Sequence, residues 1–175
     1  MDEQLLVGTA EVDITPPVGT LLAGSLKPRT SVGVDTPLCA KAIVLESGGC
    51  RLAYVALDIV SLARDMGGDE AVRRASAATG IPEDHIVYAC SHTHTGPYTH
   101  KRRQEFVNAA WLGTLPERIA EAGRSGTNDL AARLPPATIR AIEKILRERA
   151  DHNGEAWLIP PSDPVFFEAY TAGVR

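Results

Sequence analysis

The alternation of apolar and polar residues predicts three β-strands in the first third of the chain. Residues 6–15 ("LVGTAEVDIT") alternate loosely and are followed by two prolines, which predicts an edge strand because proline cannot donate a ladder hydrogen bond. Two β-rich runs then flank Ser47-Gly48-Gly49, which indicates a hairpin. The second run, residues 51–60, is almost wholly apolar, so we expect a strand buried on both faces.

A helix and a further strand follow and complete a βαβ unit. Residues 67–80 ("GGDEAVRRASAATG") have acidic residues near their start and a glycine at their end, as helices do. Residues 84–91 ("DHIVYACS") are a short apolar run typical of a strand. The strands before and after the helix should therefore be parallel. Because ligands of open parallel sheets bind beyond the carboxyl ends of the strands, Asp58 and His92 should face one crevice.

The rest of the chain has a less regular pattern of apolar and polar residues. It predicts a long loop over 18–37, a helical segment over 103–123 that breaks before Pro116, a linker over 124–134 and a second helix over 135–151. The final stretch, rich in proline and aromatic residues, receives no assignment. Together the elements predict an α/β fold, in which helices pack on a mixed sheet with a βαβ unit, and a single domain spanning 1–175.

Composition narrows the class of protein. With 44% hydrophobic and 23% charged residues the chain is typical of a globular protein, and its net charge of -4 argues against nucleic acid as a partner. No apolar run is long enough to span a bilayer, and the acidic N-terminus lacks the layout of a signal peptide. The three cysteines are an odd number without CxxC spacing, which predicts reduced thiols and a cytoplasmic location.

The candidate chemistry lies in "YACSHTHTGPYTH", residues 88–100, which holds three of the five histidines. On an extended chain His92 and His94 would point the same way, about 7 Å apart at the backbone, so that both imidazoles could converge on one ion. Zinc binds imidazole readily and, in catalytic sites, activates a water molecule. Because exposed loops also carry paired histidines, the spacing alone leaves a metal site and a histidine-rich loop equally open.

The neighbouring candidates have simpler interpretations. We expect Cys90 to be a core residue, His100 to lie on the surface, His85 to make a polar contact at a strand start and His152 to sit in a turn. For Asp58, a carboxylate that merely caps a turn and a carboxylate that works in the site are equally supported.

Three segments together resemble the N-terminal region of the neutral/alkaline non-lysosomal ceramidase family: "VGTAEVDITPPVG", "GVDTPLCAKAIVLESGGCRLAYVALDI" and "GIPEDHIVYACSHTHTGP". The resemblance covers residues 6–123. It implies a zinc-dependent amidase that cleaves the N-acyl bond of a ceramide-like lipid by metal-activated water. Carried over by position, the resemblance implies that His92 and His94 are the metal-site residues, with His92 as a zinc ligand and His94 beside the metal, where it would also act in catalysis by holding the reacting oxygen. The second catalytic candidate, Asp58, comes from its position at a strand end and not from the resemblance.

The chain also departs from that family, whose members are much longer and carry their other metal ligands and their nucleophile further downstream. By residue type alone the later candidates are His152, Glu155, Glu168 and Tyr170. The alternative is therefore a truncated, catalytically silent module that binds metal weakly or not at all. Surfaces that the absent family segments would cover are expected to promote homo-oligomers. A dinucleotide-binding domain is disfavoured, since no G-x-G-x-x-G follows a predicted strand.

Overall fold

The computed structural model describes residues 5–25 and 27–130. In chain order its elements are β1 (Leu6–Asp13), β2 (Leu21–Leu22), β3 (Arg29–Thr30), β4 (Cys39–Ser47), β5 (Cys50–Leu57), the 3-10 helix η1 (Arg64–Met66), α1 (Gly68–Thr79), the 3-10 helix η2 (Glu83–His85), β6 (Ile86–Cys90), the 3-10 helix η3 (Lys101–Phe106), α2 (Ala109–Leu112) and α3 (Leu115–Asn128).

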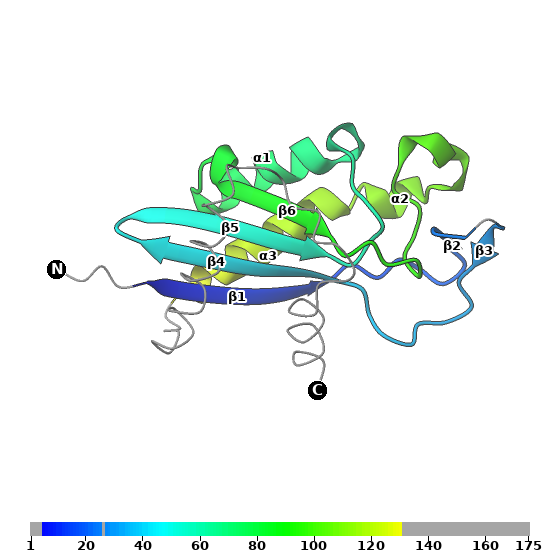
Figure 1. Cartoon of the computed structure of the whole chain (residues 1–175), viewed down its shortest axis with the longest axis horizontal. Helices are drawn as coiled ribbons and strands as arrows, with labels where there is room; N and C mark the ends of the chain where they lie inside the picture. The colour runs from blue at the N-terminus through cyan, green and yellow to red at the C-terminus, as the bar shows by residue number, and fades with distance from the viewer. Residues whose placement is uncertain (1–4, 26, 131–175) are drawn as a thin grey trace, which may run out of the picture. The chain divides into compact units, whose positions relative to one another are not determined.

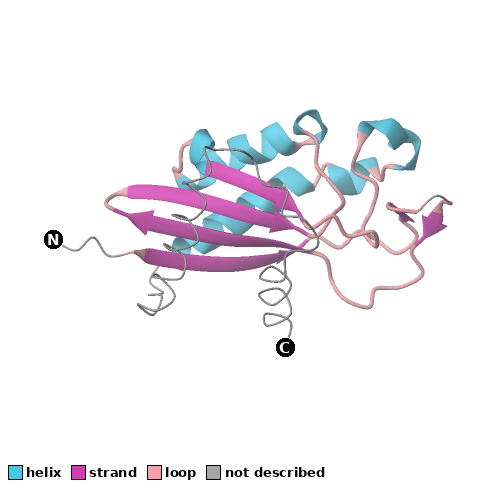
Figure 2. Ribbon diagram, in the orientation of Figure 1, coloured by secondary structure: helices cyan, strands magenta, loops and turns pink. Residues whose placement is uncertain are grey.

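Four strands form one mixed sheet in the order β1-β4-β5-β6 (Figure 1). The β1–β4 and β4–β5 pairs are antiparallel, whereas β5 and β6 are parallel and are connected through α1. Figure 2 shows the helices α1 and α3 against one face of this sheet. The predicted α/β class, the βαβ unit and the edge position of β1 are thus confirmed.

The β4–β5 hairpin closes as the sequence predicts. Ser47 pairs with Cys50, so only Gly48 and Gly49 form the loop. Both glycines have positive φ, 57° and 76°, the backbone that two-residue hairpin turns require and that side chains disfavour. The register of the whole hairpin follows from this turn.

The core lies between the sheet and the helices. Val55 and Leu57 of β5 point into it and meet Leu115 and Ile119 of α3, and all four side chains are fully buried. The helix α3 also lies very close to β1, since a Cβ atom on Gly8 would lie 1.9 Å from the carbonyl oxygen of a residue in α3. Glycine is therefore the residue type that this contact allows.

Two predictions of the sequence are wrong. The strand over 51–60 is buried on one face only, because the helices cover one side of the sheet and leave Leu52 and Tyr54 about 41% and 40% exposed. The linker over 124–134 is also wrong in its first part, since α3 continues to Asn128 and buries Gly126 against β4.

Other predictions are confirmed or lie outside the described residues. The helical segment over 103–123 is confirmed only in part, because its start belongs to the 3-10 helix η3 and Val107 and Asn108 are extended. The break before Pro116 lies between α2 and α3, as expected, and Pro116 is in the first turn of α3. The loop over 18–37 contains the two short strands β2 and β3, which pair with each other. The helix predicted over 135–151 and the candidates His152, Glu155, Glu168 and Tyr170 lie outside the described residues. Of the helices in the described ranges, none has the length and apolarity needed to cross a bilayer.

Candidate active site

The histidine stretch follows directly from the parallel strand pair. Where β6 ends at Cys90, the chain stays beside the extension of β5: the Ser91 amide donates to the Leu57 carbonyl at 2.9 Å and the His92 amide to the Ile59 carbonyl at 3.1 Å. The carboxyl ends of β5 and β6 are therefore neighbours, as the βαβ unit predicts.

The backbone of His92 is not extended, which contradicts the premise of the spacing argument. Its φ is +60°, and it is the single non-glycine residue with positive φ in the part of the chain that the structure describes. A left-handed backbone costs a non-glycine residue on the order of 1–3 kcal/mol, and such strain gathers at functional sites. The two imidazoles thus come together through a kink after β6 and not through strand alternation.

The ring of His92 is held in one orientation. Its Nδ1 lies 2.9 Å from the carbonyl oxygen of Val60. A carbonyl oxygen only accepts hydrogen bonds, so Nδ1 is the donor in this contact and Nε2 is the ring nitrogen that remains available. Metal-binding histidines are commonly oriented in this way, with one ring nitrogen bonded to a carbonyl and the other facing the ion.

His94 lies beside His92 and is positioned by the loop over 18–37. The two ring centroids are 5.1 Å apart, with the rings tilted by 60°. Arg29 Nη2 donates to the His94 carbonyl at 3.0 Å, and the ring of His94 packs on Gly24, where a Cβ atom would lie 2.2 Å from its Cγ. Both histidine side chains are exposed to solvent.

The same loop is attached to the Gly-Pro turn that follows the histidines. The Ala23 amide donates to the Gly96 carbonyl at 2.8 Å, and Leu22 forms a bridge with Pro97. Gly24 has φ +81°, so the chain turns away immediately after this contact. Two segments about 70 residues apart in sequence therefore build one site.

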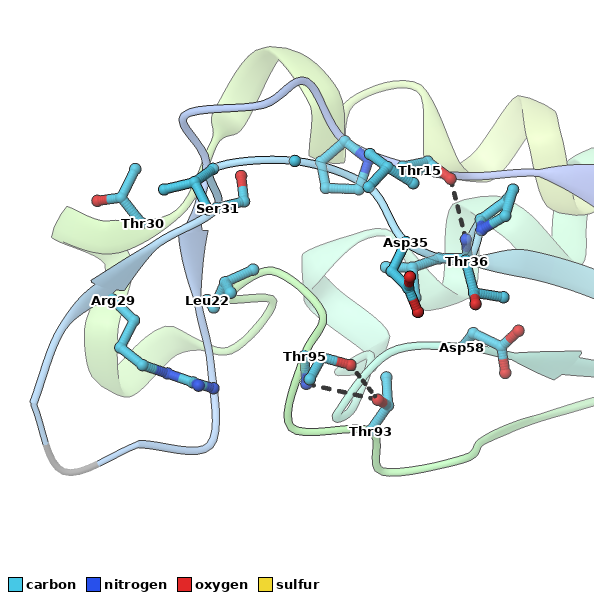
Figure 3. Close-up of a pocket in the computed structure, with 16 residues that line it drawn as sticks. Thr15, Leu22, Arg29, Thr30, Ser31, Asp35, Thr36, Asp58, Thr93 and Thr95 are labelled. Carbon is cyan, nitrogen blue, oxygen red and sulfur yellow. Dashed lines mark hydrogen bonds between the residues drawn. The ribbon is translucent and has the colours of Figure 1, made fainter.

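A pocket of about 600 Å³ lies beside the histidine pair (Figure 3). Thr93 and Thr95 contribute one wall, and their hydroxyl oxygens are 2.9 Å apart. The loop that carries Ser31 and Asp35 contributes the facing wall. Since His92 and His94 are not among the lining residues, the pocket adjoins the histidine pair and does not enclose it.

Asp58 lines this pocket, and its carboxylate also interacts with residues of β4. Its Oδ2 accepts a hydrogen bond from the Cys39 amide at 3.1 Å and lies 4.0 Å from Lys41 Nζ. The carboxylate thus holds the start of β4, which is the structural role that the sequence left open. Its catalytic role remains a prediction, and so does that of His94.

The other histidines differ in their surroundings. His85 lies at the start of β6, where its Nδ1 is 2.9 Å from the Arg51 carbonyl, the polar contact expected there. The prediction that His100 is a surface residue is wrong, because its ring packs against Tyr98 and its Nδ1 is buried. Among the described residues no group forms a hydrogen bond with that nitrogen. Cys90 packs against the core, as predicted, and burial raises the pKa of its thiol.

Two histidines are suitable for zinc but do not complete a site. Two imidazoles on one tetrahedral zinc have centroids about 5 Å apart, given zinc–nitrogen distances near 2.0–2.1 Å. The observed 5.1 Å separation and the available Nε2 of His92 therefore fit the metal. Within the described ranges, however, no group of three or more histidine, cysteine or acidic side chains is close enough to hold an ion.

Sequence reasoning missed the residues that support the histidines. Gly24, Arg29, Thr93 and Thr95 all contact the pair or its pocket. The length of the loop over 18–37 was the available signal, since long loops in compact domains often carry function. Which of its residues would meet His94 depends on the fold of the loop and could not be read from periodicity.

The chain matches no protein-family model and no curated protein. Among solved structures it is similar to the neutral ceramidase from Pseudomonas aeruginosa, with a TM-score of 0.63 and 20% identity over 74% of this chain and 22% of that one. A ceramidase complexed with C2 is also similar, with a TM-score of 0.55 and 22% identity over 77% of this chain and 22% of that one. The fold is ceramidase-like. The chain spans about a fifth of the length of these ceramidases, and identities this low show the fold alone.

Proposed function

We propose that this ceramidase-like fold serves a zinc-dependent hydrolase that cleaves the N-acyl bond of a ceramide-like lipid. The observation that carries the proposal is the orientation of His92. Its backbone is left-handed, its Nδ1 is bonded to the Val60 carbonyl so that Nε2 stays available, and its ring centroid lies 5.1 Å from that of His94. His85 makes a similar contact with a carbonyl at the start of β6 without a left-handed backbone, so the strain is particular to His92.

The residues of the site have separate roles. His92 would hold zinc through Nε2, and His94 would complete the pair and hold the reacting oxygen. When bound, zinc would polarise the amide carbonyl and lower the pKa of a water molecule. Arg29 keeps the His94 backbone in place through its bond to the carbonyl oxygen, and Asp58 lines the adjoining pocket.

The adjoining pocket fits an amide lipid in its chemistry. Hydroxyl groups of Thr93 and Thr95 offer hydrogen bonds to a polar head. Leu22 and Leu38 provide apolar surface in the same pocket for the start of a hydrocarbon chain. The pocket therefore has both polar and apolar lining residues, which is suitable for an amphiphilic substrate.

The number of ligands favours a second candidate function, that of a catalytically silent module. Two protein ligands bind zinc weakly, since catalytic zinc sites usually have three. Because the described residues supply only two, an active site needs at least one ligand from elsewhere. Measured zinc affinity therefore separates the two functions.

The experiment uses two histidines at opposite ends of β6. Zinc binding to the full chain is measured by competition with a chromophoric chelator, for the wild type, His92→Ala and His85→Ala. Both wild-type rings have Nδ1 bonded to a carbonyl of β5 or its extension, so His85→Ala is a matched control. Binding of one zinc per chain that only His92→Ala abolishes is the expected result.

Turnover of a fluorescent N-acylated sphingoid substrate is then measured with added zinc. Hydrolysis that is lost in His92→Ala and kept in His85→Ala would support the hydrolase. A wild-type protein that binds no zinc and leaves the substrate intact would instead establish the silent module. Equal losses in both variants would show that zinc binds diffusely and would refute the assigned site.

A further inference from the structure

The loop between β1 and β4 exposes three valines. Val18, Val32 and Val34 are 57%, 96% and 51% exposed, which is unusual for aliphatic side chains. The other strongly exposed large apolar residues in the described ranges lie on β4, β5 and β6. The loop is therefore a separate apolar surface, distinct from the open face of the sheet.

Backbone hydrogen bonds bring the valines together. The Gly19 amide donates to the Ser31 carbonyl at 3.0 Å, and the Ser31 amide donates to the Thr20 carbonyl at 2.9 Å. These bonds place the turn that carries Val18 beside the segment that carries Val32. Val34 follows Val32 by two residues in the same segment. Exposed apolar side chains that gather in one loop are typical of an interaction site.

This apolar surface lies at the mouth of the pocket. Val32 and Val34 line the pocket themselves, together with Ser31 and Asp35 of the same segment. Figure 3 shows the loop that carries Ser31 and Asp35 opposite Thr93 and Thr95. A surface bound by Val32 would therefore lie next to the opening through which a ligand enters.

The charge of the loop is opposite to that of the whole chain. The loop over 18–37 contains Lys27, Arg29 and one acidic residue, Asp35, so its net charge is +1, whereas the chain carries a net charge of -4. Both basic side chains are exposed. Aliphatic side chains beside lysine and arginine are the combination that binds the interface of a bilayer with anionic lipids.

We propose that the described residues of this loop, 18–25 and 27–34, form a lipid-docking surface for anionic bilayers. Val18, Val32 and Val34 enter the boundary between headgroups and acyl chains, while Lys27 meets the anionic headgroups. The pocket mouth then faces the membrane, from which an amphiphilic ligand can enter. The identity of that ligand rests on the function proposed above, whereas the docking itself requires only the loop.

The test is co-sedimentation of the full chain with phosphatidylcholine vesicles, with and without phosphatidylserine. The double variant Val32→Ser/Val34→Ser should bind about tenfold or more weakly, because two aliphatic side chains no longer enter the interface. The matched control is Ile43→Ser/Val87→Ser, which removes two exposed apolar side chains from the sheet and should change binding by no more than about twofold.

A separate measurement tests how much the positive charge of the loop contributes to vesicle binding. Lys27→Gln should weaken binding to vesicles with phosphatidylserine and leave binding to pure phosphatidylcholine unchanged, and added salt should weaken the wild type in the same way.

Wild-type protein that does not bind vesicles, or equal losses in the loop and sheet variants, would overturn the proposal. So would self-association that the loop variant abolishes in the absence of lipid, since a second copy would then be the occupant. The vesicles contain no amide lipid, so a failure of docking is distinct from a failure of hydrolysis.

Discussion

Gly24 offers the sharpest test of how the site is held together. Alanine at this position introduces a Cβ atom 2.2 Å from Cγ of His94, where ordinary contact begins near 3.4 Å, so the ring must withdraw by about 1 Å. It also places a side chain at φ +81°, which costs about 1–2 kcal/mol. Gly19 separates the two effects, because it has φ +95° and a Cβ atom there would meet nothing within 4 Å.

Both Gly24→Ala and Gly19→Ala should therefore lose about 1–2 kcal/mol of unfolding free energy in urea. Only Gly24→Ala should weaken zinc binding, by up to about 100-fold, since a displacement of 1 Å can have an effect of this size. The imidazole nitrogen signals of His94 in NMR spectra should shift in Gly24→Ala alone, and this readout does not depend on zinc. Equal zinc affinities, or equal shifts in both variants, would refute the contact between Gly24 and His94.

Three further predictions concern the fold. Trp111→Phe should lower the unfolding free energy by about 1–3 kcal/mol, because the indole Nε1 donates to the buried Ile14 carbonyl at 2.8 Å and phenylalanine would leave that carbonyl without a donor. An unchanged urea midpoint would contradict this prediction. Gly8→Ala should cost about 1–3 kcal/mol through its clash with α3, whereas Gly33→Ala, where a Cβ atom meets nothing within 4 Å, should cost little in the same urea assay. Burial raises the pKa of the Cys39 thiol from 9.0 to about 11. As the pH rises through this window the thiol ionises first in the unfolded chain, so the free energy of unfolding should fall. Cys39→Ala should therefore flatten that part of the profile of urea midpoints against pH.

The sheet could be predicted because its signals are local. The Gly48-Gly49 turn fixes the β4–β5 register, and the apolar run before the histidines marks β6. The exposed side of β5 could not be predicted in the same way. Leu52 and Tyr54 are as apolar as the residues that face the core, so the sequence alone does not show that helices cover only one face. The end of the helix at Asn128 was missed for a similar reason, since glycine and serine in its last turns resemble a linker.

The candidate site was predicted in position but not in geometry. Parallel strands place Asp58 and His92 at one end of the sheet, and the structure confirms the adjacent strand ends. The approach of His92 to His94 arises from a left-handed backbone, which no two-residue periodicity predicts. The contact with Gly24 joins distant segments and could be known only from the fold.

Hydrophobic burial does not explain the conformation of the histidine pair. Both rings are exposed, so little hydrophobic stabilisation offsets the cost of the left-handed backbone at His92. Three independent constraints nevertheless act on the same two residues: the Val60 carbonyl orients one ring, Gly24 makes room for the other, and Arg29 holds its backbone. A loop without a role would relax at least one of them, because each restricts residue type without adding buried surface. Pre-organised side chains beside a pocket are what a binding or catalytic site requires, and Nε2 of His92 is the ring nitrogen available to a ligand.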